Sequence, residues 1–178
     1  KYWQIPYKYF SVLALGFIFC IPVTHAANEI PVTLRIEGEN ATIVNTTVQV
    51  PDECDVVDTT TSTPTHFTGY KAICVLQAAQ EQQLVTYQVT NWGFAFALDS
   101  VNTIANATDW SKTWMLFKNF KDPQMGIDGF SVAENDELVL SYGAWPKLPL
   151  KLELSTSTLM VGETETLTAR VWDEATSQ

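Results

Sequence analysis

The chain has 178 residues, of which 46% are hydrophobic, 17% charged and 12% aromatic. That composition excludes a disordered chain, and eight glycines are too few for a collagen-like one. Ten basic residues against twenty acidic ones give a formal net charge of −10, and a surface of that sign repels phosphate, so we expect no nucleic-acid partner.

The first 26 residues have the pattern of a secretory signal peptide. Lys1 and Lys8 supply positive charge, and an uncharged apolar run follows over residues 9–23. This run is shorter than the about 20 residues that a membrane span needs. Small residues before the end of the segment predict cleavage after Ala26. The alternatives are a retained anchor, a buried helix or a lipid-modified Cys20, and the bulky residues before Cys20 disfavour the last of these.

The two cysteines that follow this segment predict a disulfide. Export places a protein in an oxidising compartment, and Cys54 and Cys74 form an even pair there. Their bond would close a loop and, in the chain-entropy model, stabilise the fold by about 3 kcal/mol. A metal pair or a reactive thiol is the alternative, but only His66 lies nearby in the sequence, which makes a poor zinc set. We therefore expect a secreted, extracellular protein, most simply at a cell surface.

Two strands are predicted at the start of the mature chain. Apolar and polar residues alternate strictly over residues 32–37, which is the period of a half-buried strand. A second strand is predicted over 42–50, where Val44, Val48 and Val50 share one face with Thr46. The turn residues between them, Gly38 to Asn40, predict a hairpin.

Residues 51–69 are predicted to be a long loop. They have turn chemistry without a period, and the run 59–65 is low in complexity and rich in threonine. The acidic side chains in this stretch could hold calcium, but they lack the spacing of a calcium loop, so a solvated acidic loop is preferred. They are Asp52, Glu53, Asp55 and Asp58.

One helix is predicted, over residues 70–83. Ala72, Val75, Leu76 and Ala79 recur at helical spacing, and no proline or glycine interrupts them. Cys74 falls in the first turn, so the disulfide would join the helix start to the end of the second strand.

After the helix, the composition returns to that of strands. We predict strands at 85–89, 94–98, 114–117 and 138–142, with polar connections at 99–100 and 102–112, and a further short strand that closes near Val132. Two prolines, Pro146 and Pro149, then mark a boundary. Alternation resumes at 150–154 and 167–172. About thirty residues cannot bury a core of their own, so we expect this second all-β domain, in residues 146–178, to continue beyond Gln178.

Three N-x-Ser/Thr triplets are candidate N-glycosylation sites. All are predicted in turns or on the polar face of a strand, where a glycosylating enzyme could reach them: Asn40, Asn45 and Asn106.

A family resemblance appears over residues 32–142. It is carried by the segments 114–119 (WMLFKN), 126–130 (GIDGF), 134–138 (ENDEL) and 141–142 (SY). This pattern resembles the C-terminal β-grasp domain of transcobalamin and intrinsic factor and of their bacterial and archaeal relatives. The family often has Asn-Gly after the Trp strand, where this chain has Asn119-Phe120, and Asn135 stands where a turn glycine is expected.

The resemblance implies an α+β domain over residues 27–145, in which a hairpin and one helix pack on a mixed sheet. It also implies a small-ligand site, with cobalamin as the family's ligand. Residues 154–169 resemble the start of an immunoglobulin-like module of bacterial surface proteins, which implies a truncated β-sandwich. Together these imply a modular surface protein whose protein or glycan partner is unknown. Its only membrane contact would be the N-terminal signal or a missing C-terminal anchor.

Catalysis is not expected. After residue 26 the chain has one histidine, His66, and no phosphate loop, HExxH helix or Cys/His cluster, so we expect neither catalytic nor metal-binding residues. Binding is favoured by the many tryptophans. Trp114 shares a strand face with Leu116, which predicts burial. Trp92 and Trp110 lie in loops and are the candidate ligand platform.

Overall fold

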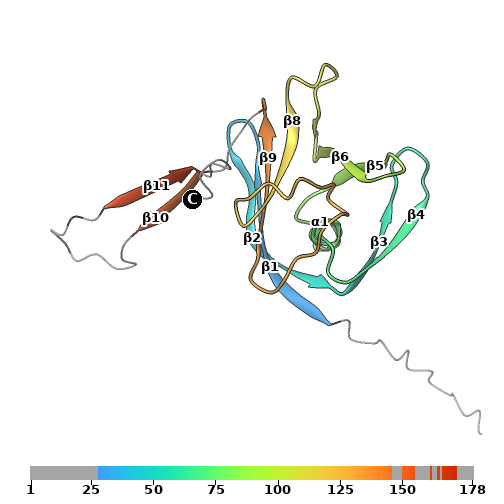
Figure 1. Ribbon diagram of the computed structural model, residues 1–178, viewed down its shortest axis with the longest axis horizontal. Coiled ribbons are helices and arrows are strands. Elements are labelled where there is room, and N and C mark those ends of the chain that lie inside the picture. The colour runs from blue at the N-terminus through green and yellow to red at the C-terminus, as the bar shows by residue number, and fades with distance from the viewer. Residues whose placement is uncertain (1–27, 146–149, 155–160, 162–163, 165, 172–178) are drawn as a thin grey trace, which may run out of the picture.

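A computed structural model describes residues 28–145, 150–154, 161, 164 and 166–171. The predicted signal segment, residues 1–26, lies outside the described residues. The domain that follows is mostly strand with one helix (Figure 1), which confirms the α+β class. Its elements are β1 (Glu29–Glu37), β2 (Thr42–Pro51), β3 (Glu53–Val57), β4 (Pro64–Thr68), α1 (Ala72–Glu81), β5 (Tyr87–Asn91), β6 (Phe96–Val101), β7 (Ile104–Ala105), β8 (Thr113–Lys118) and β9 (Glu137–Gly143).

The largest sheet has four strands in the order β2-β1-β9-β8. β1 and β2 form the predicted antiparallel hairpin, and β9 pairs parallel with β1 and antiparallel with β8. The sheet is therefore mixed, as predicted. Its inner face carries the alternate apolar residues of β1 and β2, and Val32, Leu34 and Ile36 are fully buried.

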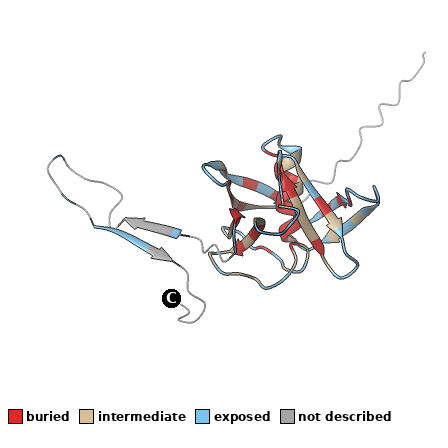
Figure 2. Cartoon of the chain, turned by 90° about the horizontal axis from the view of Figure 1, so that it is seen from above, coloured by how far each residue is buried: buried red, intermediate tan, exposed pale blue. Residues whose placement is uncertain are grey.

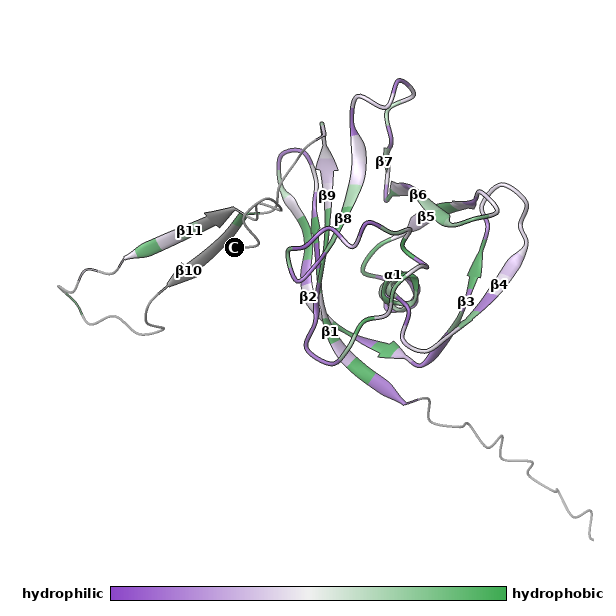
Figure 3. Ribbon diagram, viewed as in Figure 1, coloured by the Kyte–Doolittle hydropathy of each residue, from purple (hydrophilic) through white to green (hydrophobic). Residues whose placement is uncertain are grey.

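Helix α1 packs against this sheet, and the smaller sheets β3-β4 and β5-β6-β7 lie on its other side (Figure 1). Buried residues gather in the middle of the domain and exposed ones at its loops (Figure 2). Along β1, hydrophobic and hydrophilic residues alternate (Figure 3). The helix is buried on most of its surface because elements contact it from several sides. Its buried residues are Ala72, Ile73, Cys74, Val75, Leu76, Ala78 and Ala79.

The helix is shorter at both ends than the predicted 70–83. Tyr70 has a positive φ of 46°, and its carbonyl accepts a hydrogen bond from the N–H of Val132. Lys71 is extended and forms a β-bridge with Ser131. At the other end, Gln83 has a φ of 60°. Tertiary backbone pairing therefore overrides the local helical pattern at the first two positions.

The predicted disulfide is confirmed. The sulfurs of Cys54 and Cys74 are bonded, and their Cα atoms lie 5.6 Å apart. Cys54 lies in β3 rather than at the end of β2, so the bond joins the first turn of α1 to a strand of the second sheet.

The predicted loop at residues 51–69 is wrong, because β3 and β4 form an antiparallel hairpin there. Cys54 and Val56 are buried between exposed neighbours, so a short period-two signal is present after all. The turn is closed by Asp58, whose carboxylate accepts hydrogen bonds from the N–H groups of Thr60 and Thr61. From the sequence alone, an acidic residue that ends a strand in this way cannot be distinguished from one in a solvated loop.

The connections predicted at 99–100 and 102–112 are also partly wrong. Asp99 and Ser100 belong to β6, and their side chains are satisfied across the strand pair by Thr90 and Gln88. Ile104 and Ala105 form the short β7, which returns to β6. By contrast, the strand predicted near Val132 is absent from the described residues, and Val132 is buried in the core without belonging to a strand.

The turn after β8 and the turn before β9 contact each other at one end of the sheet. Asn119 and Phe120 both have positive φ, 49° and 65°, and Lys118 and Lys121 exchange two backbone hydrogen bonds around them. This is the two-residue turn for which Asn-Gly is preferred. The Asn119 amide donates to the carboxylate of Asp136. Asn135 has a φ of 66°, so asparagine does serve in the left-handed turn position as predicted.

Beyond the boundary, β10 (Leu150–Leu154) and β11 (Leu167–Val171) pair antiparallel. Both strands were predicted from the alternation of the sequence, and Trp172 lies outside the described residues.

Candidate functional site

Three exposed aromatic side chains gather at the tips of two loops. Trp92 is 50% exposed, Phe94 82% and Trp110 57%. The ring centroids of Trp92 and Trp110 lie 6.0 Å apart and those of Trp92 and Phe94 lie 6.2 Å apart, both at steep interplanar angles of 85° and 72°. The structure therefore brings the two predicted platform residues together. We call Trp92, Phe94 and Trp110 the aromatic cluster.

The first of these tips connects β5 to β6. The N–H of Trp92 donates to the carbonyl of Ala95, and the N–H of Gly93 donates to the side chain of Asn91. Gly93 has a φ of 86°, a conformation that glycine adopts without steric cost. Phe94 was predicted inside a strand, which is wrong, because this turn projects its ring into solvent. The adjacent Gly93 is the signal that could have placed Phe94 in a turn.

The second tip connects β7 to β8. The N–H of Trp110 donates to the carbonyl of Ala107, and the N–H of Ala107 donates to the carbonyl of Lys112. Trp110 has a φ of 59°, which costs a side-chain-bearing residue about 1–2 kcal/mol. A tryptophan that is both strained and more than half exposed contributes little to folding. Such an outlier points to a role at the surface.

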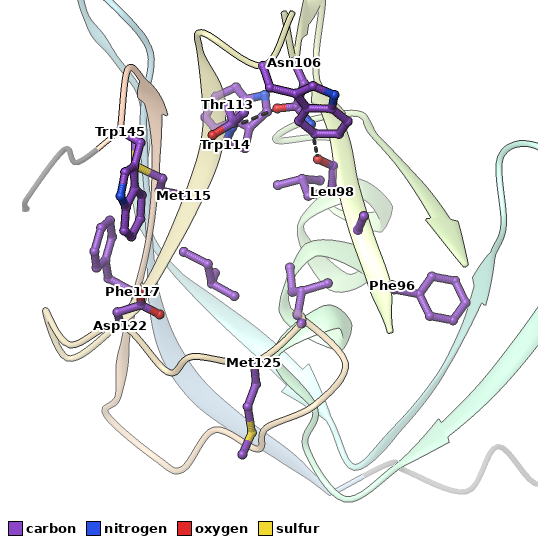
Figure 4. A pocket seen from close by; sticks show the side chains of 15 residues that line it. Phe96, Leu98, Asn106, Thr113, Trp114, Met115, Phe117, Asp122, Met125 and Trp145 are labelled. Atoms are coloured by element: carbon purple, nitrogen blue, oxygen red, sulfur yellow. Dashed lines mark hydrogen bonds between the residues drawn. The ribbon is translucent and has the colours of Figure 1, made fainter. Parts of the chain in front are cut away.

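A cavity of about 370 Å³ adjoins the cluster, and Trp110 belongs to its lining. It lies between β6 and β8, and the segment from Asp122 to Ile127 covers it. Figure 4 shows Trp145 beside Met115 and Phe117 on one flank, whereas Trp114 and Leu98 lie on the other. Trp114 itself is buried, as predicted, and its indole N–H donates to the carbonyl of Ile104. Sequence reasoning missed this cavity because its walls come from separate sheets.

Asn106 joins the two walls of the cavity. Its amide nitrogen donates to the carbonyl of Leu98 in β6, and its amide oxygen accepts from the backbone N–H of Trp114 in β8, both at 2.8 Å (Figure 4). The Trp114 N–H therefore points away from β9. Because this direction repeats every second residue, the N–H and C=O of Leu116 also point toward the cavity.

The three glycosylation candidates differ in accessibility. Asn40 and Asn45 are exposed, at the β1–β2 turn and on β2. Asn106 is half-buried, and both ends of its amide are engaged in the fold. It is therefore less accessible in the folded chain than the sequence pattern indicates.

The acidic residues of the β3–β4 hairpin do not converge. Asp58 is buried and accepts hydrogen bonds from Thr60, Thr61 and Asn91, which hold its pKa down to about 2, with the Thr60 hydroxyl as the largest cause. Asp52 lies near the strand start, apart from Asp58. In the part of the chain that the structure describes, no three His, Cys, Asp or Glu side chains gather as metal ligands.

His66 lies between two carboxylates on this hairpin. Its ring nitrogens lie 2.9 Å from Asp55 and 3.6 Å from Glu53. The hydrogen bond to Asp55, with the charges of Asp55 and Glu53, raises the pKa of His66 above its ordinary 6.5. This group has acid–base neighbours but no nucleophile beside it among the described contacts.

The raised pKa of His66 predicts a pH-dependent stability. A His66 pKa that is higher in the folded than in the unfolded state stabilises the fold. This stabilisation is complete below about pH 6.5 and is lost as the pH rises through the folded-state pKa. We expect the urea midpoint of the wild type to exceed that of His66→Gln by a small margin near pH 6, and this margin to shrink near pH 8. All three side chains are solvent-exposed, so salt should reduce the margin. A margin that grows with pH would contradict the assignment.

Comparison of the chain with protein-family models and with curated proteins returns no match. Within the described residues, no helix has the length and apolar character of a membrane span. Among the described residues, the features that indicate a function are the aromatic cluster and the cavity beside it.

Proposed function

We propose that this chain is a non-catalytic binding module of an exported, multidomain cell-surface protein, acting in adhesion or as a partner-binding spacer. The observation that carries the proposal is the aromatic cluster. Three large rings on two adjacent loop tips give a contact surface at low conformational-entropy cost, which is typical of protein and glycan recognition. The cluster adjoins a cavity that can take part of the same ligand.

The fold and compartment are part of this proposal. The strand order β2-β1-β9-β8, with a helix between the β1–β2 hairpin and the β8–β9 pair in the chain, supports a β-grasp domain over residues 27–145. The Cys54–Cys74 bond supports an oxidising compartment. The paired β10 and β11 support an immunoglobulin-like start after the boundary, which fits a chain of surface modules.

The test is a binding screen with immobilised glycans and extracellular-matrix proteins, comparing the wild type with Trp110→Ala. We expect the variant to lose at least about tenfold in affinity, the usual scale for a central aromatic residue at an interface. Val57→Ala is the matched control, because Val57 is an exposed apolar residue on a different hairpin. Equal affinity of Trp110→Ala and wild type for every ligand found would contradict the proposal.

Cobalamin binding is the second candidate, favoured by the family resemblance and by the aromatic walls of the cavity. A corrin would have to lie against the exposed cluster, since the cavity holds about 370 Å³, which fits only part of a ligand of that size. A titration of cobalamin with the chain, followed by absorption, tests this candidate because binding changes the corrin absorption. An unchanged spectrum would exclude cobalamin as the ligand.

A further inference from the structure

We propose that Trp92 and Trp110 form a site for a cationic side chain, an arginine presented by an extended segment of a partner protein. This inference rests on the proposed binding function and names the chemistry of its ligand.

The first support is the arrangement of the rings. The planes of Trp92 and Trp110 stand at 85° to each other with centroids 6.0 Å apart. Two rings at right angles form a corner in which one cation can lie within about 6 Å of both centroids. A guanidinium group can stack on one indole face while its edge meets the other. A sugar ring, by contrast, is best served by a single flat face.

The second support is charge. The chain after residue 26 has eight basic and twenty acidic residues, a net charge of −12 that attracts a cationic partner. Asp109 precedes Trp110, and hydrogen bonds from Ser111 keep the pKa of Asp109 below its ordinary value, so it stays ionised. The cation nearest in sequence, Lys112, is paired with Glu39. The loop that carries Trp110 thus also carries an ionised carboxylate, at the preceding residue.

The third support is the conformation of Trp110. Glycine would fit its φ of 59° without strain, and the side chain is 57% exposed, so neither backbone nor core packing accounts for a tryptophan there. A ligand that contacts the indole does account for it.

The adjoining cavity indicates an extended segment rather than a free ammonium compound. Trp110 lines both the cluster and the cavity, where the main chain of Leu116 points outward from the edge strand β8. The N–H and C=O of Leu116 can pair with an added extended peptide, whereas the N–H of Trp114 already pairs with Asn106 and Lys118 with Lys121. An arginine on such a peptide would reach the cluster through Trp110, which lines the same cavity as Leu116.

The experiment titrates the full chain with a short, otherwise uncharged extended peptide that carries one central arginine, and follows tryptophan fluorescence. The control peptide carries citrulline, which has the same shape without the charge. We expect the citrulline peptide to bind at least about tenfold more weakly, and arginine binding to weaken as salt increases. Equal binding of the two peptides would overturn the inference, as would choline binding as tightly as the arginine peptide.

Two variants separate binding from folding. Trp110→Gly should abolish the arginine preference while the variant still unfolds in one cooperative transition, because the ring is more than half exposed and glycine adopts this φ without strain. Trp92→Ala should weaken arginine binding in the same way. Wild-type affinity in Trp110→Gly would overturn the inference. Binding of a glycan through the cluster without any arginine preference would overturn it too, but would leave the proposed function intact.

Discussion

Replacing Cys54 and Cys74 together by alanine is expected to lower the free energy of unfolding by about 3 kcal/mol. The bond closes a loop of sequence separation 20 between β3 and the first turn of α1. Both cysteines are buried in the main core, and Cys74 is fully so. Loss of the bond therefore removes a restraint on the unfolded chain and contacts in the folded one.

Urea unfolding followed by far-UV circular dichroism measures this loss. The matched control is the wild type with and without reductant, since reduction should bring it close to the double-alanine variant while leaving that variant unchanged. An unchanged midpoint in the variant would mean that the α1 core holds without its covalent restraint.

The elements that could be predicted from the sequence are those whose burial has a long, clean period. β1 alternates from Val32 to Glu37, β2 does so except at Thr46, and α1 has four apolar residues at helical spacing. The disulfide followed from the count and separation of the two cysteines after the predicted signal segment. In each case, the local sequence pattern and the tertiary contacts favour the same structure.

The missed elements depend on partners that are distant in sequence. β3 and β4 are short, and polar residues occupy their exposed face, so only Cys54 and Val56 marked the hairpin. The start of α1 was set by pairing of Lys71 with Ser131, sixty residues away along the chain. Local patterns do not contain such information.

The candidate site was predictable only in part. The loop positions of Trp92 and Trp110 indicated exposure, and both are exposed. Their contact with each other depends on the β5–β6 turn meeting the loop that connects β7 to β8 in the other sheet. Phe94 was predicted inside a strand because it lies in an apolar run, and the cavity could not be predicted because its lining comes from β6 and β8, which belong to different sheets.

Asn106 bridges β6 and β8 through its side-chain amide, and Asn106→Ala is expected to destabilise the domain by about 2 kcal/mol. The substitution leaves the carbonyl of Leu98 and the N–H of the buried Trp114 without their side-chain partner. A backbone group that loses its partner in a largely buried place costs about 1–3 kcal/mol. The loss should also loosen the wall that Trp110 and Trp114 share, and so weaken ligand binding.

Asn106→Ala also removes an N-glycosylation triplet, so Thr108→Ala is the matched control that removes the triplet and keeps the amide. Asn45→Ala is a second control, because that asparagine is exposed on β2. We expect both controls to unfold at nearly the wild-type urea midpoint and Asn106→Ala well below it. If Thr108→Ala were destabilised as much as Asn106→Ala in a glycosylating host, the attached glycan rather than the two hydrogen bonds would be the source of stability.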